Sequence, residues 1–369
     1  MAFSYKFHAD HVGSLLRPPA LLEARRRLEA GMIDPEELRA VEDEAIAAAV
    51  KMQREAGFDI YTDGEFRRTD FRSVFADAFD GIESHFVEMP WRGPTGTVTL
   101  PSLQYTITGR LQQRRRMTEG DVAYLRSLTR KHIKVTLLAP GFVAERFWQD
   151  GVTDQVYESR EELGAEIAAA TRNEIEALFA EGVIYVQLDN PGYSAFLGSH
   201  ARTNGHGGDP ASLERMLAVD AAAVDGVERT EAGSIALHVC RGNQASLWLA
   251  EGGYEAVAEK LFNLPVDRFL LEYDDDRAGS MEPLRYMPKE KTVALGLIST
   301  KSPELEPVEE LQQRIDEAAQ HIELDNLAVS PQCGFASVAE GGNKITPEEQ
   351  YEKLRRVTDT AFATWGFEA

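Results

Sequence analysis

The chain has 369 residues, 43% of them hydrophobic, which suffices for one large α/β barrel or two ordinary domains with a substantial core. Its 61 acidic residues outnumber its 39 basic residues, and the formal net charge of −22 would repel a nucleic-acid backbone or an anionic membrane surface. We therefore expect a small-molecule partner, and neither nucleic acid nor a membrane.

The N-terminal segment carries no apolar core of signal-peptide length, and no apolar run of 18 residues occurs anywhere in the sequence. The sequence therefore predicts a cytoplasmic protein. In that reducing compartment the two cysteines, Cys240 and Cys333, are expected as thiols or metal ligands and not as a disulfide.

Short apolar runs alternate with longer helical patterns along the chain. The runs predict eight strands, near 11–16, 59–65, 134–139, 184–189, 235–240, 269–273, 293–299 and 327–333. Residues 160–181 show helical spacing and end before Gly182, a typical helix stop. Apolar strands that alternate with helices indicate a parallel sheet, so we predict an α/β fold, a (β/α)8 TIM barrel, with a doubly wound sheet as the alternative.

One segment interrupts this rhythm before the third predicted strand. Residues 91–116 contain several prolines and glycines, and residues 103–111 alternate in polarity, which predicts a β-hairpin insertion at about 90–116. We interpret it as a surface hairpin; the alternatives are a lid and a contact between copies in a homo-oligomer. No linker divides the chain, so residues 1–369 are predicted to form a single barrel domain.

Polar residues that are unusual for strands stand at the C-terminal ends of the predicted strands, where barrel enzymes hold their catalytic groups. They are His11, Ser14, Asp63, Glu65, Asp189, His238, Cys240, Glu272, Lys301 and Cys333. Because packing alone is a poor explanation for this distribution, we expect a functional site there.

Four of these residues predict a zinc site. His238 and Cys240 lie two apart in an apolar run, so on a strand they share one face and can reach one metal ion together with Cys333. Glu272, at the end of another apolar run, is the fourth predicted ligand because an unpaired carboxylate there would be costly. The alternatives are ordinary burial of the cysteines and an ion pair between Glu272 and an arginine such as Arg277.

This ligand set also predicts a type of chemistry. Two thiolates, one imidazole and one carboxylate around Zn²⁺ have a formal total charge of −1, which makes the ion a poor generator of hydroxide. A substrate thiol bound to such an ion would ionise well below its free pKa of roughly 8.5 and would stay nucleophilic.

The motifs resemble the cobalamin-independent methionine synthase family, specifically its zinc-carrying C-terminal barrel. The resemblance covers nearly the whole chain and rests on six motifs in order: Val12-Gly13-Ser14, Asp63-Gly64-Glu65, Gln187-Leu188-Asp189, His238-Val239-Cys240, Leu271-Glu272 and Ser330-Pro331-Gln332-Cys333-Gly334. It implies that Zn²⁺ is held by the four predicted ligands.

The resemblance also implies how homocysteine is bound. Ser14 would hold its carboxylate, and Glu65 and Asp189 would hold its amino group, which is chemically sensible because carboxylates recognise an ammonium ion. The alternatives are a salt bridge from Glu65 to Arg67 or Arg68, and a helix-capping role for Asp189.

The sequence departs from the family on the methyl-donor side. Full-length members carry an additional N-terminal barrel, whereas this chain has the catalytic one. Where the family has Asp-Ile-His-Ser-Pro with a proton-donating histidine, this sequence reads Ser299-Thr300-Lys301-Ser302-Pro303. Asn190-Pro191 replaces Glu-Pro, and residues 141–148 do not clearly preserve the tryptophan that stacks on the pterin. The zinc and amino-acid residues are spared.

We therefore predict a zinc-dependent methyltransferase that methylates a thiol, with homocysteine as acceptor and methionine as product. The donor stays open between a methylfolate, a methylcorrinoid and a sulfonium compound. Lys301 or His11 would be the acid for the leaving group, and an electrostatic contact to an anionic donor is the alternative for Lys301. The competing functions are a zinc-dependent alkyl transferase similar to coenzyme M transferases, a metal-independent decarboxylase of the same superfamily, a zinc hydrolase, and a non-catalytic barrel with structural zinc.

Overall fold

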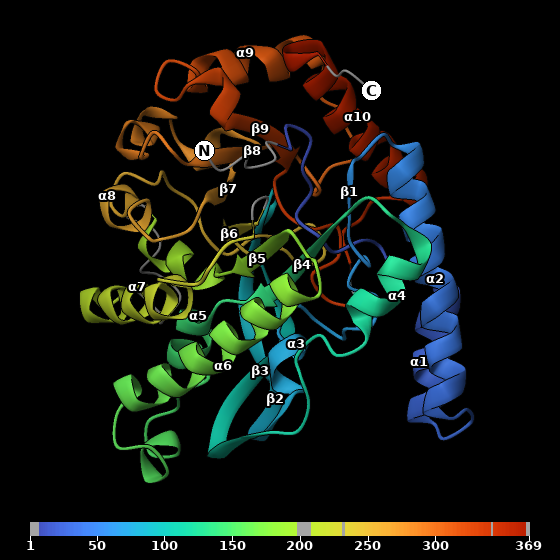
Figure 1. Cartoon of the computed structure of the whole chain (residues 1–369), viewed down its shortest axis with the longest axis vertical. Helices are drawn as coiled ribbons and strands as arrows, with labels where there is room; N and C mark the ends of the chain where they lie inside the picture. The colour runs from blue at the N-terminus through green and yellow to red at the C-terminus, as the bar shows by residue number, and fades with distance from the viewer. Residues whose placement is uncertain (1–6, 198–207, 231–232, 341, 367–369) are drawn as a thin grey trace.

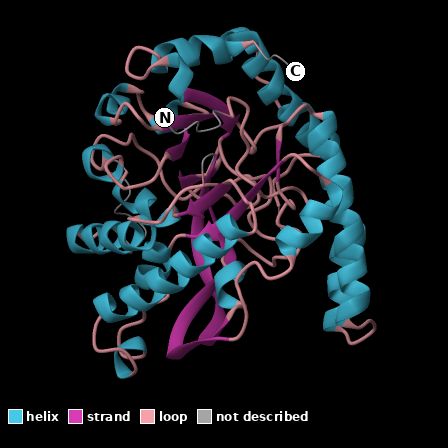
Figure 2. Cartoon of the chain, viewed as in Figure 1, coloured by secondary structure: helices cyan, strands magenta, loops and turns pink. Residues whose placement is uncertain are grey.

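A curled parallel sheet surrounded by helices forms the centre of the computed structural model, which describes residues 7–197, 208–230, 233–340 and 342–366 (Figures 1 and 2). Its seven strands follow one another in the order β1-β4-β5-β6-β7-β8-β9, and every neighbouring pair is parallel. The strands are β1 (Ile60–Tyr61), β4 (His132–Leu138), β5 (Tyr185–Asp189), β6 (Ser234–Val239), β7 (Arg268–Glu272), β8 (Thr292–Ile298) and β9 (Leu327–Pro331).

The N-terminal segment lies between β9 and β1. Ala9 forms a parallel bridge with Val329 of β9, and the Leu15 amide donates a hydrogen bond to the Gly64 carbonyl just after β1. The strand predicted near 11–16 is not formed, since the one bridging residue of this segment is Ala9 and the chain turns at Gly13, whose φ of 140° is unfavourable for other residues. With this segment as its eighth member, the fold is the predicted (β/α)8 TIM barrel.

Alternate strand residues fill the inside of the barrel, because successive side chains of a strand point to opposite faces. The inner group combines small and large side chains from successive strands: Val12, Ile60, Tyr185, Ala236, Leu270, Ala294 and Ala328. The residues of the other face pack against the helices in a larger apolar cluster. The barrel therefore has a filled core.

The helices lie around the outside of the sheet (Figure 2). They are α1 (Pro19–Glu29), α2 (Pro35–Glu55), α3 (Ser73–Ala76), α4 (Asp121–Leu128), α5 (Pro140–Arg146), α6 (Arg160–Ala180), α7 (Pro210–Val224), α8 (Ala258–Leu261), α9 (Val308–Ala318) and α10 (Pro347–Trp365). The predicted helix at 160–181 matches α6, which is capped by the Ser159 side chain and ends just before Gly182. Each helix in the described ranges is too short or too polar to span a bilayer.

A long antiparallel hairpin precedes β4, the third barrel strand, and projects away from the ring in Figure 1. Its strands are β2 (Phe79–Gly93) and β3 (Gly96–Gln113). The predicted hairpin is present, but it begins at residue 79 and not near 90. Most side chains between these two positions are exposed or half-buried, so they carry no apolar alternation from which a strand could be predicted.

Candidate metal centre

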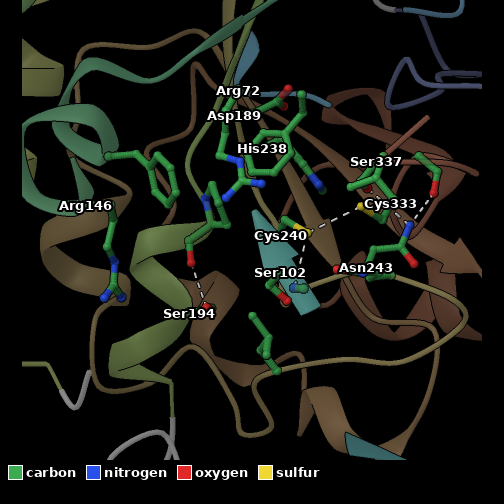
Figure 3. Close-up of a pocket in the computed structure, with 18 of the residues that line it drawn as sticks. Arg72, Ser102, Arg146, Asp189, Ser194, His238, Cys240, Asn243, Cys333 and Ser337 are labelled. Atoms are coloured by element: carbon green, nitrogen blue, oxygen red, sulfur yellow. Dashed lines mark hydrogen bonds between the residues drawn. The ribbon is translucent and has the colours of Figure 1, made fainter. Parts of the chain in front are cut away.

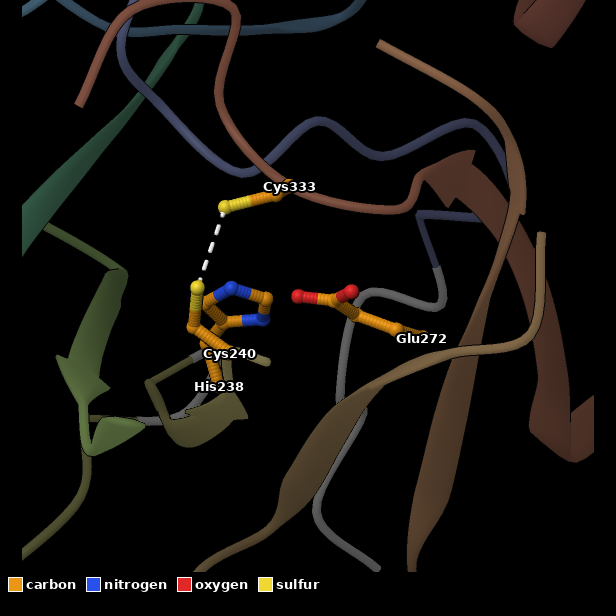
Figure 4. Close-up of side chains that lie close together, drawn as sticks. All are labelled: His238, Cys240, Glu272 and Cys333. Atoms are coloured by element: carbon orange, nitrogen blue, oxygen red, sulfur yellow. Dashed lines mark hydrogen bonds between the residues drawn. The ribbon is translucent and has the colours of Figure 1, made fainter. Parts of the chain in front are cut away.

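Four side chains from three strand ends converge on one point (Figure 4). His238 belongs to β6 and Cys240 follows that strand, Glu272 ends β7, and Cys333 lies two residues beyond β9. One potential ligand atom from each residue lies within 4.8 Å of the other three. The structure thus brings together the four residues from which the sequence predicts a metal site.

His238 presents a ring nitrogen to this point. Its Nδ1 lies 3.3 Å from the Leu270 carbonyl oxygen, which fits a tautomer with the proton on Nδ1 and the lone pair on Nε2. The Nε2 atom is buried and makes no well-formed hydrogen bond within the described residues. Burial alone would lower the pKa of His238, but the Cys333 sulfur beside it raises that pKa to about 9. A metal ion would displace the proton that this pKa leaves on Nε2 and would bind the nitrogen lone pair.

The two sulfur atoms are spaced for one shared ion. Cys240 Sγ lies 3.4 Å from Cys333 Sγ, and both cysteines are free. Two thiolates on a tetrahedral zinc would be ~3.8 Å apart, given Zn–S bonds of about 2.3 Å. A hydrogen bond from Cys240 lowers the pKa of Cys333 well below its usual range, and the same contact raises the pKa of Cys240. The donor set and its spacing therefore fit zinc.

Glu272 completes the cluster from β7. Its Oε1 accepts a hydrogen bond of 2.8 Å from the Arg241 amide. Burial raises the pKa of Glu272 to about 7, against the opposing effect of the Lys301 ammonium group. The alternative ion pair with Arg277 is not formed, because Arg277 pairs with Asp274 and Asp275.

A cavity of about 300 Å³ opens beside the cluster (Figure 3). Its wall includes three cluster residues and the three predicted homocysteine-binding residues: His238, Cys240, Cys333, Ser14, Glu65 and Asp189. A substrate in this cavity would therefore contact the candidate metal ligands and the predicted amino-acid ligands together.

Glu65 keeps one carboxylate oxygen free for a ligand. Its Oε1 accepts a hydrogen bond of 2.8 Å from Thr136 Oγ1 and lies 3.6 Å from Arg68, so the predicted alternative salt bridge engages this oxygen alone. Oε2 is buried without a hydrogen-bond partner among the residues described. The backbone of Glu65 has a φ of 59°, a left-handed conformation that costs about 1 kcal/mol or more in a residue other than glycine and is concentrated at functional sites.

Asp189 is the last residue of β5 and faces the same cavity. Gln187 donates a hydrogen bond of 2.7 Å to its Oδ1. Burial, and to a smaller extent the Glu65 carboxylate, raise the pKa of Asp189 to about 7 against the opposing effect of His238. The helix-cap alternative belongs to its neighbour, because the Asn190 side chain caps the short 3-10 helix Pro191–Phe196.

Ser14 and Gly334 meet at the cavity wall. A β-carbon at Gly334 would overlap the Ser14 hydroxyl, so a glycine is required after Cys333 for the two segments to approach. The Phe335 amide donates a hydrogen bond of 2.9 Å to the Ser14 carbonyl and fixes this contact. The Ser14 side chain is thereby held next to the segment that carries Cys333.

The two candidate acids do not line this cavity. His11 packs its ring edge-on against Phe58, and its Nε2 lies 3.3 Å from the Ile60 carbonyl. Burial lowers the pKa of His11 to about 4, so its ring is neutral at physiological pH. Lys301 Nζ is buried without a hydrogen-bond partner in the described ranges, and its charge acts on Glu272, Cys240 and Cys333.

The hairpin contributes to the cavity, which was not predicted from the sequence. Trp91 and three other hairpin residues line the cavity: Met89, Ser102 and Gln104. Arg92 forms a two-residue bridge with Trp248 on the loop after β6, which holds the hairpin over the cavity. The insertion is therefore a wall of the site and not a plain surface hairpin. One signal was available, since a tryptophan is unexpected in an exposed strand.

The wall near α5 was also unexpected. Trp148 lines the cavity, so segment 141–148 does supply an indole, although the Arg160 guanidinium covers one face at 4.8 Å from the ring centroid. Arg72 and Arg146 line the same cavity. Neither arginine stands at a strand end, and sequence periodicity therefore gave no reason to single them out.

The chain is similar to known proteins over nearly its whole length. The family described as "Cobalamin-independent synthase, Catalytic domain" matches residues 7–357. The uncharacterized protein YxjH of Bacillus subtilis is 38% identical over 366 residues, which cover 97% of this chain and 95% of that protein. The 5-methyltetrahydropteroyltriglutamate–homocysteine methyltransferase of Bacillus velezensis is 26% identical over 354 residues, which cover 95% of this chain and 42% of that protein.

The fold is shared with a solved structure. A candidate vitamin-B12-independent methionine synthase from Listeria monocytogenes superimposes with a TM-score of 0.73 at 28% identity, and the match covers 98% of each chain. The matched residues include the candidate metal cluster and the cavity beside it.

Proposed function

The chain belongs to the family of cobalamin-independent synthase catalytic domains, and on this premise we propose that it is a zinc-dependent methyltransferase that converts homocysteine to methionine. The observation that carries the proposal is the His238, Cys240, Glu272 and Cys333 cluster at the wall of a cavity that also exposes two carboxylates. These four residues would hold Zn²⁺, whose chemistry is to ionise a bound thiol near neutral pH.

Three residues orient the amino acid in this proposal. Glu65 Oε2, which has no hydrogen-bond partner among the described residues, and the Asp189 carboxylate bind the ammonium group, and Ser14 binds the carboxylate. A thiol without an ammonium group, such as the sulfonate thiol of a coenzyme M transferase, would leave both carboxylates unpaired, which disfavours that alternative. A metal-independent decarboxylase would leave the cysteine and histidine cluster without a role.

Lys301 is proposed to offset the negative charge of the cluster. It lies close enough to Glu272 and both cysteines to affect their ionisation, and its buried Nζ has no hydrogen-bond acceptor in the part of the chain described. The formal charge of −1 on a zinc complex with two thiolates and a carboxylate is balanced by one ammonium group. This role replaces the acid role for Lys301, and His11 is assigned none.

Homocysteine binding tests the proposal directly. Binding to the zinc-loaded protein at pH 7 is expected to release close to one proton, because the thiol must ionise to bind zinc. Calorimetry in buffers of different ionisation enthalpy measures this number. A release of zero protons would contradict thiolate formation.

The same calorimetry tests the ammonium site. Glu65→Gln and Asp189→Asn are each expected to weaken homocysteine binding by ~10- to 100-fold, the loss of a charge-assisted hydrogen bond. Propanethiol, which lacks the ammonium group, should bind all three proteins equally. Glu309→Gln, at an exposed carboxylate of α9, is the control. Equal losses for both thiols would exclude an ammonium-specific role.

The methyl donor is predicted to have a leaving group that needs no proton. Methylfolate must be protonated at nitrogen to leave, yet His238 is the one histidine among the described cavity-lining residues and is assigned to the metal. Transfer from methylfolate is therefore expected to be slower than ~1 s⁻¹ in single-turnover experiments. A methylcorrinoid or a sulfonium donor should react faster, and methylfolate rates at or above that value would contradict the prediction.

A further inference from the structure

Arg146, the last residue of α5, brings a guanidinium group to the cavity wall. In Figure 3 it lies on the opposite side of the pocket from Cys333, with Ser194 nearby. In the ranges that the structure describes, no oxygen accepts a hydrogen bond from Arg146 and no carboxylate lies within 4.0 Å of its nitrogens. Burial lowers the pKa of Arg146, but an arginine remains charged at all physiological pH values.

The other arginines around this position all have partners. Arg72 is 3.1 Å from Asp70 and donates to the Leu103 carbonyl at 2.7 Å. Arg160 is 3.2 Å from Asp150. Arg146 thus differs from Arg72, the other arginine of the cavity, in having no carboxylate within 4.0 Å among the described residues.

The carboxylate of the preceding residue is already occupied. Glu145, which precedes Arg146, accepts a hydrogen bond of 2.6 Å from Arg215 and one of 2.8 Å from Ser212 Oγ. Its side chain is turned toward α7 by these contacts, and it is only 6% exposed. Arg146 therefore faces the cavity with a full positive charge in a chain whose net charge is −22.

Arg146 is half-buried at the cavity wall, and an anionic ligand there would accept hydrogen bonds that no described residue takes from it. A carboxylate is the group that matches its planar fork best, through two parallel charge-assisted hydrogen bonds. An anion at this position would be separated from the metal cluster by the width of the cavity. If homocysteine occupies the end with Glu65 and Asp189, the second substrate must lie at the end with Arg146.

We propose that Arg146 binds an anionic group of the methyl donor, and that the donor is a compact carboxylate-bearing molecule such as a carboxylated sulfonium. This inference rests on the proposed function, because it treats the cavity as the site of both substrates. In the transfer, a carbon–sulfur bond forms between the homocysteine thiolate and the methyl group as the methyl–sulfonium bond breaks. The bond pair leaves with a neutral thioether, so no proton donor is required.

Equilibrium binding of the demethylated product tests the inference without turnover. The probes are 3-(methylthio)propanoate and its neutral isostere 3-(methylthio)propanamide, titrated into the full chain with and without zinc. The wild type is expected to bind the carboxylate ~10- to 100-fold more tightly than the amide. The Arg146→Gln protein should lose this preference, and the Arg146→Lys protein should keep part of it.

Arg355→Gln is the matched control, because this substitution removes the same unit of charge. Arg355 lies on the exposed side of α10, 3.7 Å from Asp359. The Arg355→Gln protein should retain the full preference. No preference in the wild type, no binding of either probe, or an unchanged preference in Arg146→Gln would overturn the inference. Because the titration of the metal-free protein does not depend on zinc or on homocysteine, its result is independent of a failure of the proposed methyl transfer.

A kinetic pair then links the site to the donor. Dimethylsulfoniopropionate and trimethylsulfonium present the same reactive methyl group with and without a carboxylate. In the wild type, single-turnover transfer to homocysteine should be at least ~10-fold faster from the carboxylated donor than from the neutral donor. In the Arg146→Gln protein the two donors should react at the same rate. Equal rates for the two donors in the wild type would refute the assignment of Arg146 to the donor.

Discussion

Replacing Cys333 or Cys240 by serine is expected to remove zinc from the purified protein and to abolish methyl transfer. Each cysteine would supply one of two thiolates to the ion, and their Sγ atoms lie 3.4 Å apart at the same point of the cluster. Loss of groups that merely support a ligand lowers metal affinity by 10- to 100-fold, so loss of a thiolate itself should cost more than ~100-fold. Elemental analysis of the variants measures the effect.

Both variants are expected to remain folded, because the two apolar clusters that form the core of the barrel contain neither cysteine. Circular dichroism and thermal unfolding of the metal-free wild type provide the reference. Ser337→Ala is a suitable control, since Ser337 lines the cavity without belonging to the cluster, and it should retain one zinc per chain. A full complement of zinc in either cysteine variant would exclude the four-ligand site.

The architecture could be predicted from the sequence because parallel barrel strands are buried on both faces and appear as continuous apolar runs. Seven predicted strands match β1 and β4 to β9, with ends displaced by a few residues. The segment around Gly13 and the start of the hairpin could not be placed. The first depends on a backbone turn at one glycine, and the second depends on a strand whose side chains are mostly exposed.

The candidate metal cluster could be predicted for a geometric reason. His238 and Cys240 share a strand face, and the C-terminal ends of parallel strands meet at one rim, so residues far apart in sequence converge there. His11 also belongs to a strand-like segment, but its ring points toward Phe58 and away from the cavity. The alternation of side chains along a strand predicts their direction only where the backbone is regular, and the chain turns close to His11.

The contributions of Arg146 and of the hairpin could not be predicted, because they depend on how separate elements pack. Arg146 reaches the cavity from the end of a short helix, and Trp91 reaches it because the hairpin is paired with the loop at Trp248. Neither arrangement follows from local spacing. Arg146 belongs to segment 141–148, where the sequence departs from its family, and this is where the substrate preference of the chain is expected to differ.

A buried charge network at the other end of the barrel is expected to control stability. Asp10 is completely buried, and it is 2.9 Å from Lys134, 2.9 Å from Arg268 and 2.7 Å from the Tyr185 hydroxyl. These partners come from β4, β5 and β7, so one carboxylate links the N-terminal segment to three strands. Loss of the carboxylate should therefore be costly, because a buried cation without its counter-ion is strongly destabilising.

Asp10→Asn is therefore expected to lower the free energy of unfolding by about 3–5 kcal/mol at pH 7, because it leaves Lys134 and Arg268 buried without a carboxylate. Asp59→Asn, which removes an ion pair of the same length, 2.9 Å to Lys131, but on the surface, should cost less than ~1 kcal/mol. Urea denaturation of the two variants and the wild type measures both values. Similar small losses would show that the network contributes little.

The pH dependence of that difference gives a second test. Burial alone would raise the pKa of Asp10, but Lys134 and Arg268 outweigh it and hold the pKa well below its ordinary value of 3.8. A carboxyl group with a depressed pKa in the folded state contributes stability above its unfolded pKa, and this contribution is lost as the pH falls toward the folded value. The difference in the free energy of unfolding between wild type and Asp10→Asn should therefore be constant from pH 7 to about 5 and should become smaller below about pH 4. A gap that stays constant down to about pH 2 would contradict an ionised Asp10 as the source of the stability.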